Sequence, residues 1–230
     1  MTAAAPARPD TREMIVVHDL FRRLFGDLPG LIAAVSDGDV ARAVRLCDCV
    51  DELTTGLEHH HTNEDELLWP KLLDRVGLDT AIVLKAEEQH ERVHELLELV
   101  QTHTKRFRVS AGAGDRDCLA ATLAELDEAL REHMADEERL ILPLVEEHLT
   151  VAEWAELGER GRAGIPKDRL LIQLGWMLDG VSADDRQAFL RELPLPARIA
   201  WRLIGKRRFA REKAEIYGTA QPGGVAARPR

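Results

Sequence analysis

The chain has 230 residues, of which 45% are hydrophobic and 31% charged, and its formal net charge is −10. This length allows one domain with an appended region. The composition is typical of a helix-rich globular protein and excludes wholesale disorder. From Arg198 onward the chain carries nine Lys or Arg and only two Glu, so the preceding part is strongly acidic. That acidity excludes a free nucleic-acid-binding protein.

The first ten residues contain two prolines and no apolar run, so they cannot form the hydrophobic core of a secretory signal. No stretch reaches the roughly 18 apolar residues that a membrane helix needs. The cysteines Cys47, Cys49 and Cys118 are odd in number, and a helix would point the close pair in different directions. We therefore expect a cytoplasmic protein with buried or neutral thiols, without a disulfide framework.

Apolar residues recur at helical spacing and no segment alternates like a strand, so the sequence predicts an all-α fold. Four long amphipathic helices should begin near residues 10, 39, 79 and 115, and Pro29-Gly30 should bend or end the first. With short connections they pack as an antiparallel up-down four-helix bundle. The predicted organisation is a flexible N-terminal tail (1–10), the bundle (11–149), a helical extension (150–217) that begins at a Thr150–Glu153 capping box, and a flexible tail (218–230).

Polar side chains interrupt the apolar stripe of every predicted bundle helix. They are His18 on the first helix, His60 and Glu64 on the second, His90 and His94 on the third, and His133 and Glu137 on the fourth. A carboxylate buried without a cation is costly, and a metal ion supplies the missing charge. Imidazole with carboxylate suits iron, manganese, zinc or copper better than calcium or magnesium. The pattern therefore predicts a metal centre inside the bundle.

An internal repeat supports this prediction. His18 precedes His60 by 42 positions and His90 precedes His133 by 43, and both second histidines open the pattern His-x3-Glu-x5-Pro. Two helical hairpins related by a pseudo-twofold axis would form a near-symmetric site for two metal ions. Each Glu would then bridge the two ions.

The sequence resembles the hemerythrin-type HHE cation-binding family over roughly residues 11–149, through His18, the run from His59 to Pro70, His90 and the run from His133 to Glu138. The segment from Trp154 to Gly205 is similar to an extension found in actinobacterial members. The resemblance implies two non-haem irons, with Zn or Mn as alternatives. It assigns His18 and His60 to one iron, His90, His94 and His133 to the other, and Glu64 and Glu137 as bridges. The family's oxygen carriers place the last carboxylate one position later, at Glu138 here, but Glu137 preserves the internal symmetry.

Other charged and polar groups near these motifs have simpler interpretations. His59 and His61 are expected in solvent or just outside the ligand set, although His61 can reach the edge of the stripe and is a minor candidate ligand. His103 and His148 are expected at the surface. Among Asp65, Glu66, Asp136 and Glu138, one carboxylate is a candidate acceptor for the N–H of a ligating histidine. The basic segment 206–211 is interpreted first as docking onto the acidic bundle, and otherwise as a solvated face or a site for a membrane or acidic partner.

The resemblance implies a protective di-iron protein that binds or turns over O2, peroxide or nitric oxide. It leaves open whether the protein is an enzyme. One alternative is a non-catalytic iron- or oxygen-sensing module that signals through the C-terminal helices, and another is a zinc-filled structural bundle. The expected partner is the small ligand alone, without nucleic acid or stable membrane insertion, and the sequence does not determine the oligomeric state.

Overall fold

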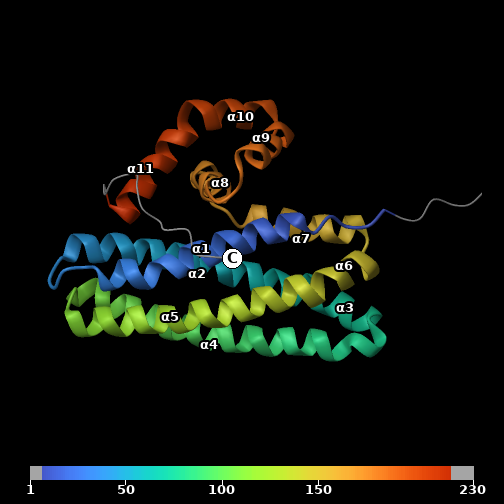
Figure 1. The fold of residues 1–230 in the computed structure, drawn as a ribbon, viewed down its shortest axis with the longest axis horizontal. Helices are drawn as coiled ribbons and strands as arrows, with labels where there is room; N and C mark the ends of the chain where they lie inside the picture. The colour runs from blue at the N-terminus through green and yellow to red at the C-terminus, as the bar shows by residue number, and fades with distance from the viewer. Residues whose placement is uncertain (1–6, 219–230) are drawn as a thin grey trace, which may run out of the picture.

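The computed structural model describes residues 7–218, and their regular structure is entirely helical (Figure 1). Four long helices lie side by side: α1 (Arg12–Ala33), α2 (Val40–Leu67), α4 (Thr80–Ser110) and α5 (Ala113–Asp136). Helix α1 packs against α2 and α5, and α4 packs against the same two helices. The predicted all-α four-helix bundle is confirmed.

Shorter elements complete one end of the bundle and form the extension. At the end of the bundle lie α3 (Trp69–Arg75), the 3-10 turn η1 (Gly77–Asp79), the π turn η2 (Glu137–Ile141) and α6 (Leu142–His148). The extension contains α7 (Val151–Ala163), α8 (Leu170–Asp179), α9 (Ala183–Glu192), α10 (Leu195–Ala200), the π turn η3 (Trp201–Gly205) and α11 (Lys206–Tyr217). None of the helices in this described part of the chain is both long and apolar enough to cross a membrane.

The predicted helix ends differ from the structure in one instructive place. Helix α1 does not end at Pro29-Gly30 but continues to Ala33. Leu28 and Ile32, on either side of the proline, are almost completely buried. Their burial outweighs the backbone hydrogen bond that Pro29 cannot donate. The predicted flexible tails fall mostly on residues 1–6 and 219–230, outside the described part of the chain.

The bundle core is formed by the predicted apolar stripes, and Cys47 and Cys49 belong to it. All three cysteines are free, and only Cys118 is exposed. Burial raises the pKa of the Cys47 thiol to about 11, so this thiol is neutral at physiological pH. Cys47 and Cys49 therefore contribute to packing, as the sequence predicts.

The extension is fixed to the bundle through α2. Helix α7 opens with the predicted capping box of Thr150 and Glu153 and packs against α2. Arg169 forms ion pairs with Glu52 of α2 at 2.5 Å and with Glu212 of α11 at 2.6 Å. Trp176 of α8 donates its indole N–H to Glu212 over 3.0 Å. A half-buried polar network thus joins α8 and α11 to the helix that carries the His-x3-Glu motif.

Candidate metal centre

The four bundle helices bring nearly all the predicted ligands together, buried in one place. Within the described residues, two groups of side chains could each hold a metal ion. The first contains His61, Glu64, His90 and His133, and the second contains His18, His60, Glu64 and Glu137. In each group the candidate ligand atoms lie within 4.8 Å of one another. Glu64 belongs to both groups, which makes it a candidate bridge between two ions.

The carboxylate geometry fits two adjacent ions. Glu64 Oε1 lies 3.3 Å from His60 Nε2, while its Oε2 lies 3.6 Å from His90 Nε2. Each oxygen of this carboxylate therefore faces a different group. Glu137 Oε2 lies 3.2 Å from His18 Nε2 and 3.6 Å from His133 Nε2. Glu137 thus lies near histidines of both groups through one oxygen, although Glu137 itself belongs only to the second group.

Unpartnered buried atoms test whether these residues suit a metal. Both carboxylate oxygens of Glu64 and of Glu137 are buried without a hydrogen bond, and so are the Nε2 atoms of His18, His60 and His61. Buried polar atoms without partners are rare, because each costs about 1–3 kcal/mol. Here they converge on common points, and the Nε2 atoms of His90 and His133 face each other at 3.3 Å. A cationic metal would satisfy this mixed nitrogen and oxygen donor set.

Two further carboxylates orient the ligating rings, one more than the sequence predicts. Glu138 accepts a hydrogen bond from His18 Nδ1 over 2.9 Å, and Asp65 accepts one from His90 Nδ1 over 2.7 Å. Glu138 is itself held by Arg22 at 2.8 Å. A carboxylate on Nδ1 fixes the tautomer that leaves the Nε2 lone pair free for a metal.

These outer carboxylates also obey the internal repeat. Asp65 directly follows Glu64, and Glu138 directly follows Glu137. Asp65 of the first hairpin orients His90 of the second, whereas Glu138 of the second orients His18 of the first. The two hairpins therefore exchange equivalent contacts across the predicted pseudo-twofold axis.

Burial and charge shift the protonation equilibria of the site strongly. Burial lowers the pKa of His60 to about 3 and that of His133 to about 4, and it places the pKa of His61 well below its ordinary value. Burial and the neighbouring Glu137 raise the pKa of Glu64 well above its ordinary value. Although burial opposes the charged form of His18, Glu137 and Glu138 raise its pKa to about 9. Neutral imidazoles are the form that a metal requires, so His60, His61 and His133 are ready for one, whereas His18 would release a proton when a metal binds.

The structure corrects one predicted ligand. His94 lies outside both groups, with 61% of its side chain exposed, 3.8 Å from Glu98. The inward positions of α4 alternate spacings of four and three, running through Ala86, His90, Val93 and Leu97, and His94 falls beside them. His61 instead belongs to the first group of candidate ligands. It is 7% exposed and stacks on His90, with ring centroids 4.1 Å apart.

The sequence held a signal for His61. Leu57, His61, Glu64 and Leu68 repeat the four-three-four spacing of the buried stripe. The other flanking histidines, His59, His103 and His148, lie outside both groups. The two candidate groups together contain five histidines and two carboxylates, and they include His61 but not His94.

A π turn follows the last ligand. In η2 the backbone N–H of Leu142 bonds to the carbonyl of Glu137, five residues earlier. The wider turn directs Ile141 inward and leaves Leu140 half-buried, although helical spacing predicts Leu140 on the inward stripe. Such turns are common at functional sites. Here the turn opens the packing between α4 and η2.

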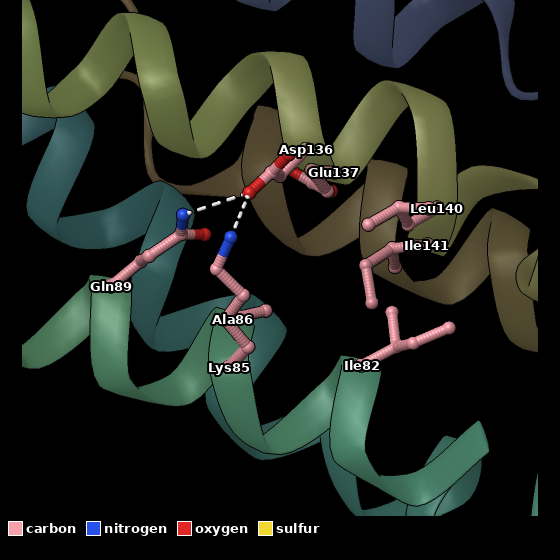
Figure 2. A pocket seen from close by; sticks show the side chains of 8 residues that line it. All are labelled: Ile82, Lys85, Ala86, Gln89, Asp136, Glu137, Leu140 and Ile141. Carbon is pink, nitrogen blue, oxygen red and sulfur yellow. Dashed lines mark hydrogen bonds and ion pairs between the residues drawn. The ribbon is translucent and has the colours of Figure 1, made fainter. Parts of the chain in front are cut away.

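A small pocket reaches the centre at this position. Its volume is about 10 Å³, room for about one water molecule, and Glu137 forms part of its wall. Figure 2 shows Asp136 at its rim, accepting hydrogen bonds from Lys85 at 2.6 Å and Gln89 at 3.2 Å. Hydrogen bonds from the positively charged side chains of Lys85 and Arg139 lower the pKa of Asp136 to about 2. The polar rim therefore stays charged at physiological pH.

A helical bundle with histidines and carboxylates on facing helices defines a class of metal-binding bundle proteins. The family model for the hemerythrin HHE cation binding domain matches residues 10–145, which is more than half of the chain. The chain therefore belongs to the hemerythrin HHE cation-binding family, as the sequence motifs predict. No curated relative and no solved structure matches it.

Proposed function

We propose that the chain is a non-haem di-iron protein that binds or turns over O2, peroxide or nitric oxide. The observation that carries this proposal is the carboxylate of Glu64, whose two oxygens face two different groups of ligands. A second carboxylate and five imidazoles surround it. Ferritin-like di-iron proteins use more carboxylates and fewer histidines, so this nitrogen-rich set supports a hemerythrin-type centre.

Bound iron would supply Lewis acidity and one-electron redox chemistry toward a small ligand. The protein's own groups hold the centre ready for it. Asp65 and Glu138 keep the Nε2 lone pairs of His90 and His18 directed inward. The apolar core around the site excludes bulk water, which strengthens the electrostatic interactions inside. The pocket beside Glu137 has room for about one water molecule, so substrates of more than a few atoms are excluded by size.

The direct test is to purify the protein without added metal, quantify bound metals and record visible spectra in air and after peroxide. About two irons per chain with oxo-bridged bands are expected. The double variant His60→Ala/Glu64→Ala should lose both the iron and the bands, whereas the exposed neighbour His59→Ala serves as a matched control and keeps them. Little iron in the wild type, or unchanged bands in the double variant, would overturn the proposal. Zinc with no visible absorption would indicate the structural bundle instead.

A sensing role is the second candidate, and the contacts of α2 favour it. This helix contributes His60, His61 and Glu64 to the site, and the same helix contacts α7 and α11. Metal occupancy could therefore alter how firmly the extension is held. Peroxide turnover by the purified protein would favour the first role. An inert centre, with hydrogen exchange of residues 150–217 that depends on metal, would favour sensing.

A further inference from the structure

The extension carries a surface that the metal centre does not use. Residues 195–211 form α10, η3 and the first part of α11, and α10 lies on the side turned away from the bundle (Figure 1). This segment contains six Lys or Arg and no acidic residue, in a chain whose net charge is −10. We define its basic helical face by six exposed side chains: Ile199, Arg202, Leu203, Ile204, Lys206 and Arg207.

The aliphatic members of this face lie in water although the helix has a well-packed inner side. Ile199, Leu203 and Ile204 are 48%, 67% and 52% exposed. Trp201 and Gly205, on the inner side, are buried, and η3 packs against α8 and α11. The exposed aliphatic side chains are therefore not needed to fold the extension. Adjacent exposed apolar groups rimmed by polar ones are typical of interaction sites.

The cations of this face are also unpaired. Arg202, Lys206 and Arg207 make no hydrogen bond or ion pair within residues 7–218. Farther along α11, by contrast, Lys213 contacts Asp179 at 2.8 Å.

The expected docking of the basic segment onto the acidic bundle does not occur. Helix α11 instead docks through its own acidic residues, since Glu215 pairs with Arg45 at 3.2 Å and Glu212 with Arg169 at 2.6 Å. The free positive charge of α11 and η3 faces outward. It is therefore available to an external anion.

We propose that the basic helical face binds the surface of an anionic phospholipid membrane. The cations would contact lipid phosphates while the aliphatic side chains enter the boundary between headgroups and acyl chains. A nucleic acid or an acidic protein surface would pair with the cations but would offer Leu203 no apolar layer to enter. A second copy of the chain would bring like charges together across a symmetric contact. The helix would lie on the membrane and not cross it.

Vesicle flotation with the full-length, metal-loaded protein tests this proposal. Phosphatidylcholine vesicles with a phosphatidylglycerol fraction should carry the protein to the top of the gradient, whereas pure phosphatidylcholine vesicles should not. Added salt should weaken the binding, because the charges are exposed and screened. Equal binding to both vesicles, or none to the anionic ones, would overturn the proposal.

Charge variants locate the binding to this face. The triple variant Arg202→Gln/Lys206→Gln/Arg207→Gln should bind anionic vesicles about 100-fold more weakly. A control with the same change in net charge uses exposed cations elsewhere, Arg92→Gln/Lys105→Gln/Lys167→Gln, and should bind almost normally. Equal losses in both variants would show attraction without a defined face and would overturn the proposal.

The apolar contribution is tested separately by Leu203→Ser, which keeps every charge. It should weaken vesicle binding roughly tenfold while thermal unfolding of the protein stays unchanged. Light scattering, which measures the oligomeric state, tests whether a second copy of the chain covers this face. If the wild type is a dimer and Leu203→Ser makes it a monomer, a second copy covers the face and the membrane proposal is overturned.

Discussion

The presence of His61, and not His94, among the candidate ligands leads to a specific prediction. His61→Leu removes one of four ligands from the group that also contains Glu64, His90 and His133. Loss of groups that merely orient a ligand weakens metal binding 10–100-fold, so loss of the ligand itself should cost at least about 100-fold for one ion, or about 2.7 kcal/mol. His94→Leu is the matched control. Its side chain is 61% exposed, so we expect normal metal binding.

Two measurements can detect this difference in metal binding between His61→Leu and His94→Leu. Metal analysis after chelator competition should give about two irons per chain for the wild type and His94→Leu, but about one for His61→Leu. The increase in melting temperature on adding iron should also be smaller in His61→Leu, by roughly 5–10 °C for a protein of this size. If His94→Leu lost an ion while His61→Leu kept both, the ligand assignment from the structure would be refuted.

Three further predictions concern the pocket, the extension and pH. Asp136→Ala removes the acceptor at the pocket rim, so stopped-flow mixing should show faster ligand entry at unchanged iron content; an equal rate would mean that ligands enter elsewhere. Arg169→Leu breaks the partly buried ion pairs with Glu52 of the bundle and Glu212 of α11, so we expect a loss of about 2 kcal/mol and faster proteolysis of the extension, with metal binding intact. In the metal-free protein, burial lowers the pKa of three site histidines below the unfolded value of 6.5, so stability should fall as pH drops below 6.5. The raised pKa of Glu64 offsets one of them above pH 4.5, which leaves a slope of up to about 2.7 kcal/mol per pH unit in urea unfolding. The iron-loaded protein should show a steeper slope, because iron keeps protons off its ligands in the folded state while the unfolded chain still takes them up.

The bundle was predictable because its signals are local. Helical periodicity and the glycine-rich break near residue 112 predict both ends of α4 and the start of α5 to within two residues. Pro29 is a local signal for a helix end, but α1 continues through it because its neighbours Leu28 and Ile32 are buried. Most of the candidate site was predictable for a related reason. A histidine or carboxylate on an apolar stripe is unusual enough to stand out without knowledge of the partner helices.

The choice between His94 and His61 shows that a uniform four-residue spacing is not enough to assign the buried face of a helix. His90 and His94 are four residues apart, but the buried stripe continues through Val93, so only one of the two histidines lies on it. The same alternation applied to α2 includes His61. The outer contacts of Asp65 and Glu138 were harder to assign, because each joins opposite hairpins, 25 and 120 residues apart in sequence. The sequence alone places these carboxylates on a solvated face. Only the packing of the two hairpins determines which carboxylate accepts a hydrogen bond from which histidine.

The repeat also explains why the two candidate ion positions are unequal. Aligning His60 with His133 places His61 opposite Met134, a buried apolar residue. One group therefore gains a third imidazole, whereas the other has two imidazoles and the added carboxylate of Glu137. A carboxylate offsets positive charge and a neutral imidazole does not, so the group near His18 favours the more highly charged ion. The pocket beside Glu137 therefore adjoins the more carboxylate-rich side of a scaffold that is otherwise nearly symmetric.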